Sequence, residues 1–212
     1  MAPLYAGVCD LRLGILGGTF DPIHFGHLLA AEEARTTLHL DRVLFVPAAL
    51  PPHKQGLPVL PIGHRLAMVE LAIADNPAFS ASTVDIDRPG PHYTLDTIRR
   101  LRDEWKTGAE RTFFIMGADS LAQLPTWYQP QRFIECCRLA VVARPNYDDE
   151  LADLEAALPG LSRRLDWTEM PAMGISATDL QLRVREGRSI RYQVPAEVAR
   201  YVFHHNLYRQ SL

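Results

Sequence analysis

The chain has few cysteines and no long apolar run. Of its 212 residues three are cysteine, Cys9, Cys136 and Cys137, and no two of them form a C-x-x-C pair. Adjacent cysteines make poor disulfide partners, which favours a reducing compartment. The sequence shows no signal peptide and no apolar stretch near the roughly 18 residues that read as a membrane span. We therefore expect a cytoplasmic protein without a membrane partner.

An excess of positive charge is also lacking. Lys and Arg number 22 against 25 Asp and Glu, so the formal net charge is −3. Domains that bind nucleic acid are usually markedly basic, so we expect no nucleic-acid partner. The length suits one domain with a full core. We predict a loose leader over residues 1–10 and a single domain over residues 11–212, helical from about residue 174. Nothing in the sequence indicates an oligomeric state.

Predicted strands and helices alternate along the chain. The strands are expected at residues 11–16, 42–47, 79–86, 112–116, 139–143 and 165–170. The helices are expected from the first glycine-rich turn to about residue 40, and at residues 65–74, 93–105, 148–158, 178–186 and 196–205. This order predicts an α/β, Rossmann-like doubly wound parallel sheet with helices on both faces and a helical C-terminal end. Ligands of such folds bind at the carboxyl ends of the strands, near the switch point.

The glycine-rich turn at residues 17–27, G-G-T-F-D-P-I-H-F-G-H, joins the first predicted strand to the first helix. Backbone N–H groups in such a turn and the positive end of the helix dipole attract phosphate. The phosphate-binding G-x-x-x-x-G-K-[ST] loop is absent, and Gly14, Gly17 and Gly18 lack the dinucleotide-binding G-x-G-x-x-G spacing. An ordinary turn with surface histidines is an alternative. Half of a metal site is another, although the pair lacks the Glu and third ligand of zinc motifs.

The turn resembles the G-x-F-D-P-x-H-x-G-H signature of the adenylyl- and cytidylyltransferase superfamily, and I-S-A-T at residues 175–178 resembles its second motif. Within the superfamily the chain most resembles the bacterial nicotinate-nucleotide adenylyltransferases, over nearly its whole length after the leader. Further matching segments are P-P-H-K (51–54), Tyr93-Thr94, M-G-A-D-S (116–120), Trp127 and Ala143-Arg144-Pro145. The resemblance implies an enzyme of NAD biosynthesis that joins ATP and nicotinate mononucleotide, giving deamido-NAD and pyrophosphate.

The chemistry of this reaction explains the residue types in the turn. A phosphate monoester has a second pKa near 6, so it is a largely ionised nucleophile at neutral pH and needs no strong general base. Positioning and charge stabilisation should then dominate. His24 and His27 would hydrogen-bond the triphosphate and the developing charge, and Lys54 would add a point charge. We expect no protein metal site, since Mg²⁺ would be held mainly by the ATP phosphates and water.

The resemblance implies two further groups of binding residues. The residues that would meet ATP or its neighbourhood are Gly17, Gly18, Thr19, Phe20, Gly117, Asp119, Ser176 and Thr178. The residues that would meet nicotinate mononucleotide are Tyr93, Thr94, Trp127 and Arg144. Trp127 would stack on the pyridine ring, and backbone N–H groups near Tyr93-Thr94 would receive the carboxylate.

Some of these residues have a purely structural alternative. Ser176 and Asp179 fit a helix capping box, Trp127 could be packed in the core, and Asp119 could be a plain cap. Arg144 could be an exposed strand end, and the arginines between residues 183 and 191 could form a solvated face.

Two departures from the family pattern affect the expected contacts. Gln181 stands where the family usually has an arginine, and Ala48-Ala49 stand where some relatives have asparagines. We hypothesise that Arg185, one turn after Gln181, replaces the missing arginine. The rival functions are a pantetheine-phosphate adenylyltransferase and a nucleotide-binding regulatory module without catalysis.

Overall fold

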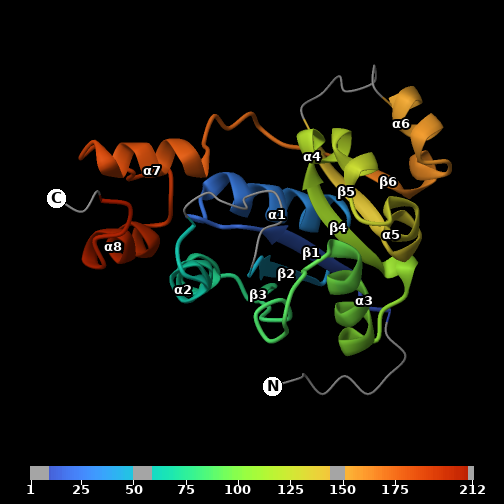
Figure 1. Cartoon of the computed structure of the whole chain (residues 1–212), viewed down its shortest axis with the longest axis horizontal. Helices are drawn as coiled ribbons and strands as arrows, with labels where there is room; N and C mark the ends of the chain where they lie inside the picture. The colour runs from blue at the N-terminus through green and yellow to red at the C-terminus, as the bar shows by residue number, and fades with distance from the viewer. Residues whose placement is uncertain (1–9, 50–58, 144–150, 210–212) are drawn as a thin grey trace.

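The computed structural model describes residues 10–49, 59–143 and 151–209. Six parallel strands form one sheet in the order β3-β2-β1-β4-β5-β6 (Figure 1). Their bounds are β1 Leu13–Gly18, β2 Arg42–Pro47, β3 Phe79–Ala81, β4 Thr112–Gly117, β5 Arg138–Ala143 and β6 Leu165–Glu169. The chain leaves β1 toward β2 and β3, and later returns to the other side of β1 with β4. The predicted doubly wound α/β fold is confirmed, with its switch point between β1 and β4.

Helices cover both faces of the sheet. One face carries α1 Phe25–Thr37, α2 Ile62–Ile73, α7 Ala177–Arg185 and α8 Ala196–His204. The other carries α3 Thr94–Trp105, α4 Ala118–Ala122, α5 Pro130–Cys136 and α6 Leu151–Ala157. Along β2, Val43 and Phe45 enter the first core, while Leu44 and Val46 enter the second. Because strands buried on both faces are apolar at every position, β2 reads as a continuous apolar run. Figure 1 shows α7 and α8 together at one end of the molecule.

The predicted element boundaries need some corrections. The strand expected over residues 79–86 is wrong beyond Ala81, because the backbone turns there: Ile86 N–H and Asp87 N–H both donate to the carbonyl of Thr83. The first strand begins at Leu13 rather than residue 11, and it extends into the glycines because Gly17 and Gly18 pair with β2. Helices α4 and α5 were not predicted, since five and seven residues are too short to show a clear helical period. No helix in the three described ranges is long and apolar enough to span a bilayer.

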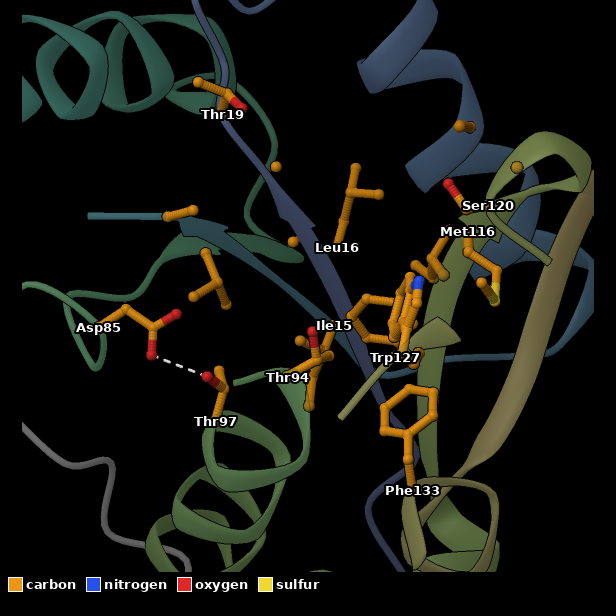
Figure 2. A pocket seen from close by; sticks show the side chains of 18 of the residues that line it. Ile15, Leu16, Thr19, Asp85, Thr94, Thr97, Met116, Ser120, Trp127 and Phe133 are labelled. Atoms are coloured by element: carbon orange, nitrogen blue, oxygen red, sulfur yellow. Dashed lines mark hydrogen bonds between the residues drawn. The ribbon is translucent and has the colours of Figure 1, made fainter. Parts of the chain in front are cut away.

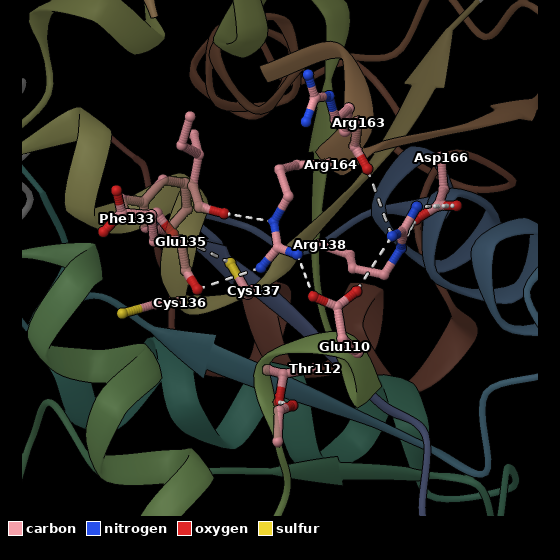
Figure 3. Close-up of polar contacts among 12 residues, drawn as sticks. Glu110, Thr112, Phe133, Glu135, Cys136, Cys137, Arg138, Arg163, Arg164 and Asp166 are labelled. Atoms are coloured by element: carbon pink, nitrogen blue, oxygen red, sulfur yellow. Dashed lines mark hydrogen bonds and ion pairs between the residues drawn. The ribbon is translucent and has the colours of Figure 1, made fainter. Parts of the chain in front are cut away.

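An ion-pair network joins the amino-terminal ends of β5 and β6 (Figure 3). Arg138 donates to both carboxylate oxygens of Asp166, at 2.6 and 2.9 Å, and pairs with Glu110 at 3.4 Å. Glu110 also pairs with Arg164. Partly exposed pairs of this kind contribute about 0–1 kcal/mol each, and more when they form a network with good geometry.

Arginines from this region also satisfy the end of α5. Arg164 donates from Nε to the carbonyl of Ile134 at 2.7 Å and from Nη2 to that of Glu135 at 3.2 Å (Figure 3). Arg102 donates to the carbonyl of Cys136 at 3.0 Å. Because the last carbonyls of a helix have no partner within it, these bonds stabilise the C-terminus of α5. Cys136 and its neighbour are buried free thiols, as expected for adjacent cysteines.

Candidate active site

A cavity of about 560 Å³ lies at the carboxyl ends of β1 and β4, where the strand order reverses. Its size is typical of small-molecule sites, which measure about 300–1,000 Å³. Figure 2 shows Asp85 and Thr97 on one side and Trp127 and Phe133 on the other. The residues predicted from sequence that line it are Gly17, Gly18, Thr19, His27, Tyr93, Thr94, Gly117 and Trp127. Four separate segments of the predicted site therefore meet in one cavity.

Other predicted site residues lie beside the cavity rather than in its lining. Asp119 is exposed in the first turn of α4, and its neighbour Ser120 lines the cavity instead. Ser176 and Thr178 are exposed at the start of α7. The start of α7 is nevertheless adjacent to the first motif, because a Cβ added at Gly26, which lines the cavity, would lie 4.0 Å from the carbonyl oxygen of Ile175.

Three other predicted site residues are not part of the cavity lining described above. Arg185 is the exposed last residue of α7. Lys54 and Arg144 lie outside the described residues.

The two histidines of the turn form a stacked pair at the start of α1. His24 is the N-cap of the helix and His27 its third residue, and their ring centroids are 3.8 Å apart with 28° between the planes. The backbone N–H of His24 donates to Nδ1 of His27 at 3.3 Å, so a neutral His27 ring carries its proton on Nε2. Burial lowers the pKa of His24 to about 4. At neutral pH His24 therefore acts as a hydrogen-bonding group rather than as a positive charge.

Glycines and a buried phenylalanine give the turn its shape. A Cβ added at Gly18 would lie 3.0 Å from the ring of Phe20, and one at Gly26 would lie 3.0 Å from the ring of His24. Glycine at position 26 thus leaves room for the imidazole beside the backbone. Phe20 has φ +50°, a conformation that is uncommon for a side-chain-bearing residue, and its buried ring meets His27 edge-on with centroids 5.0 Å apart. Phe20 therefore packs against His27 and limits the movement of its ring.

Aromatic rings form the opposite wall. Trp127 packs against Phe114, with ring centroids 5.8 Å apart, and against Phe133, with ring centroids 5.4 Å apart, and it also lines the cavity. Packing and ligand contact are thus compatible for Trp127, whose stacking on a ligand stays a prediction. Tyr93 stacks on Tyr128 with centroids 3.9 Å apart and 16° between the planes.

Helix α3 begins at the cavity. Tyr93 is its N-cap and Thr94 its first residue, and both line the cavity. The first N–H groups of a helix have no intrahelical partner and lie at the positive end of its dipole. This helix start is therefore suited to binding an anionic group.

Sequence reasoning missed a polar part of the lining. Asp85 is buried, and its Oδ1 accepts hydrogen bonds from Thr97 Oγ1 at 2.7 Å and from Arg88 Nη2 at 2.8 Å. No motif marks Asp85, which lies in the part of the predicted strand over residues 79–86 that does not form a strand in the structure. Thr97 could have been found, because it follows Thr94 by three residues and so shares its face of the helix. Phe114 could also have been found from its alternation with Phe113 along β4.

The second motif caps α7 as expected. Ser176 Oγ accepts a hydrogen bond from the backbone N–H of Asp179 at 3.1 Å. The carboxylate of Asp179 pairs with Arg183 at 2.6 Å. Gln181, at the position of the expected arginine, donates from Nε2 to the carbonyl oxygen of Asp21 at 2.6 Å. Its side chain therefore connects α7 to the glycine-rich turn.

Two buried carboxylates, Asp21 and Asp85, accept hydrogen bonds from protein donors. Asp21 accepts hydrogen bonds from Tyr208 and from the backbone of Leu60, and Asp85 accepts them from Arg88 and Thr97. Within the described ranges, no group of three or more His, Cys, Asp or Glu side chains is arranged to hold a metal ion.

Comparisons with known proteins find a matching family model and relatives that share one name. The profile of the cytidylyltransferase-like family matches residues 15–183. A protein of Thermomicrobium roseum named probable nicotinate-nucleotide adenylyltransferase is 50% identical over 198 residues, which are 93% of this chain and 92% of that protein. A protein of Thermus thermophilus with the same name is 47% identical over 199 residues, 94% of this chain and 100% of that protein.

The fold has relatives among solved structures. The structure of Plasmodium falciparum nicotinic acid mononucleotide adenylyltransferase complexed with NaAD superposes with a TM-score of 0.76 at 14% identity, over 94% of this chain and 98% of that one. At this identity the likeness concerns the fold alone.

Proposed function

The chain belongs to the cytidylyltransferase-like family of nucleotidyltransferases, and from this premise we propose that it transfers the adenylyl group of ATP to nicotinate mononucleotide in NAD biosynthesis. The products are deamido-NAD and pyrophosphate. The observation that carries the proposal is the cavity, which brings the glycine-rich turn and His27 together with an aromatic wall and the start of α3. The relatives of about 50% identity that bear this activity in their names support it.

The reaction needs positioning more than acid–base chemistry. A phosphate oxygen of nicotinate mononucleotide attacks the α-phosphorus of ATP and forms a new P–O bond. The bond from that phosphorus to the oxygen bridging to the β-phosphate breaks, and pyrophosphate leaves with the electron pair. His27 Nε2–H and the neutral His24 would donate to the phosphate oxygens where charge develops. Lys54 would add a positive charge there.

The proposed ATP site is built around the first turn of α1. Backbone N–H groups from Gly17 to Thr19 and the positive end of α1 would receive the phosphates. Phe20 would hold the histidines in place through its contact with His27. The remaining residues proposed for ATP are Gly117, Asp119, Ser176, Thr178 and Arg185.

The proposed acceptor site is the aromatic wall and the start of α3. Trp127 would stack on the pyridine ring. The packing of the Trp127 indole against Phe114 and Phe133 would fix the orientation of the indole and thereby the plane of the bound pyridine ring. Backbone N–H groups of Tyr93 and Thr94 would receive the nicotinate carboxylate, and Arg144 would add a positive charge.

A divalent metal is expected for this family of enzymes, and we propose Mg²⁺ bound mainly by the ATP phosphates. Phosphate oxygens and water are the ligands that Mg²⁺ prefers. Asp21 and Asp85 already accept hydrogen bonds from protein donors, which supports metal binding by the ATP phosphates rather than by these carboxylates. When bound, Mg²⁺ would neutralise part of the charge that builds up on the leaving pyrophosphate. We further propose that the other partners are the two small-molecule substrates and that the protein acts in the cytoplasm.

Pyrophosphate release tests the proposed function directly. The purified protein with ATP and Mg²⁺ should release pyrophosphate rapidly with nicotinate mononucleotide, and at background rate with phosphopantetheine or without an acceptor. Release with phosphopantetheine alone would instead indicate a pantetheine-phosphate adenylyltransferase. ATP binding without release for either acceptor would indicate a non-catalytic nucleotide-binding module.

Arg185→Ala should raise the KM for ATP by about 10-fold, the effect of losing one charged hydrogen bond. Successive helical residues are about 100° apart, so Arg185 lies about 40° round from Gln181 and about 6 Å along the axis. Helical side chains lean toward the N-terminus, where the phosphates would bind. Steady-state kinetics at saturating nicotinate mononucleotide provide the measurement.

Arg183→Ala is the matched control for this prediction. Arg183 already pairs with Asp179, and such a partly exposed pair contributes about 0–1 kcal/mol. Its loss should leave the KM for ATP almost unchanged. Adding Gln181→Arg to Arg185→Ala should partly restore the KM. Equal and small effects of the two alanine variants would show that both arginines are solvated surface charges.

A further inference from the structure

The aspartate of the glycine-rich turn is held by two remote parts of the chain. Asp21 is 2% exposed. Its Oδ1 accepts a hydrogen bond of 2.6 Å from the hydroxyl of Tyr208, which lies 187 residues further along the chain. Its Oδ2 accepts one of 3.2 Å from the backbone N–H of Leu60. Both oxygens act as acceptors, which suits an ionised carboxylate.

Two more side chains hold the backbone of the same turn. Gln181 donates to the carbonyl of Asp21 at 2.6 Å. Arg65, 1% exposed, donates from Nη1 to the carbonyl of Thr19 at 2.8 Å and from Nε to that of Leu60 at 3.0 Å. The turn is therefore tied to α2, to α7 and to the segment that follows α8.

The charges of this cluster are balanced. Burial lowers the pKa of the Arg65 guanidinium, and the negative charge of Asp21 opposes that change. Burial and the neighbouring carboxylate both raise the pKa of the Tyr208 hydroxyl, which therefore remains a protonated donor. A carboxylate beneath a phosphate site would repel the phosphates if it were unpaired. The donors around Asp21 reduce that repulsion and also fix the position of the side chain.

We infer that Tyr208 is a positioning residue for the active site, since its hydroxyl anchors Asp21 and thereby the turn that presents His24 and His27. The residue before Asp21 has φ +50°, and a side-chain-bearing residue stays in that region only where its surroundings hold it there. His24, the N-cap of α1, lies three residues after Asp21. A loosened Asp21 would therefore let the strained backbone relax and move the histidines. The inference rests on the proposed function for its kinetic consequence.

Tyr208→Phe tests the anchor, since it removes the hydroxyl and keeps the ring. The variant should lower kcat by about 10-fold, because small misplacements of catalytic groups are costly in rate. The KM for each substrate should change by less than about twofold, since the groups that bind them remain present. Amide hydrogen exchange over residues 18–23 should become faster, because the native hydrogen bond that holds this turn is lost.

Tyr201→Phe is the matched control. The Tyr201 hydroxyl makes a 2.9 Å hydrogen bond to Nδ1 of His64, so it also joins the C-terminal helices to α2. Tyr201 is not among the cavity residues. Both variants should lower the melting temperature by a similar small amount, while Tyr201→Phe keeps the wild-type kcat and the wild-type exchange over residues 18–23.

The outcomes separate the anchor from the proposed function. Wild-type kcat and exchange in Tyr208→Phe would overturn the inference, and so would an equal loss of kcat in Tyr201→Phe. A wild-type protein that releases no pyrophosphate with nicotinate mononucleotide would overturn the proposed function alone. Hydrogen exchange, measured with and without a non-hydrolysable ATP analogue, would in that case still decide whether Tyr208 holds the turn.

Discussion

His27→Ala should lower kcat by about 10²-fold or more, the usual cost of removing a donor that stabilises developing charge. His27 lines the cavity, and the hydrogen bond to its Nδ1 places the proton of the neutral ring on Nε2. Alanine removes this donor from the phosphates and also removes the acceptor of the His24 backbone N–H. The measurement is steady-state pyrophosphate release at saturating ATP and nicotinate mononucleotide, with a melting curve to show that the variant is folded.

His24→Ala should have an effect of similar size. Its ring is buried and stacked on that of His27, so its removal takes away one donor and the support of the other. Because burial lowers the pKa of His24 to about 4, the ring stays neutral between pH 5 and 8. The activity should therefore show no titration of His24 over that range. An ionisation near pH 6.5 that disappears in His24→Ala would contradict this assignment.

Two further variants distinguish hydrogen bonding from packing. His27→Gln places an amide N–H near the position of Nε2, so it should recover part of the activity lost in His27→Ala. His204→Ala is the control, because His204 is exposed at the end of α8 and lies outside the cavity lining. Near-normal turnover in His27→Ala would show that His27 has no catalytic role.

Nicotinate mononucleotide should be preferred over its nicotinamide counterpart by about 10² to 10³ in kcat/KM. Backbone N–H groups at the start of α3 and the positive end of that helix suit a carboxylate. The amide of the nicotinamide form would place its NH₂ group against these donors, and mispaired polar groups cost a few kcal/mol. Pyrophosphate release at limiting concentrations of each acceptor measures the ratio. Comparable kcat/KM values would defeat the assignment.

One substitution removes a single backbone donor from this site. Thr94 is the first residue of α3, where proline is tolerated, and Tyr93 before it is extended, as a residue before proline must be. Thr94→Pro should therefore keep the helix and lose one N–H group. It should reduce the preference for the acid by about 10-fold, the value of one hydrogen bond to a charged group. Thr94→Val, which loses the hydroxyl but keeps the N–H, should retain more of the preference.

The C-terminal part of the chain shows where sequence patterns are informative. The helices α7 and α8 were predicted within one residue at each end, because proline, serine and apolar period mark helices locally. The hydrogen bonds of Gln181 in α7 and of Tyr208 after α8 to the glycine-rich turn were not predicted. Gln181 was noted as a departure from a family pattern, and its contact with Asp21 depends on residues 160 positions apart. Tyr208 carries no local signal at all.

The sequence by itself determined the alternation of strands and helices and the glycine-rich turn that carries His24 and His27. These features depend on residues close together in the chain, where periodicity, caps and glycine positions act directly. The tertiary structure alone decided that Asp85 shares a cavity with the turn, and that Arg65, Gln181 and Tyr208 hold the turn in place. Such contacts come from burying two faces of one sheet, which brings together residues whose separation in sequence carries no signal.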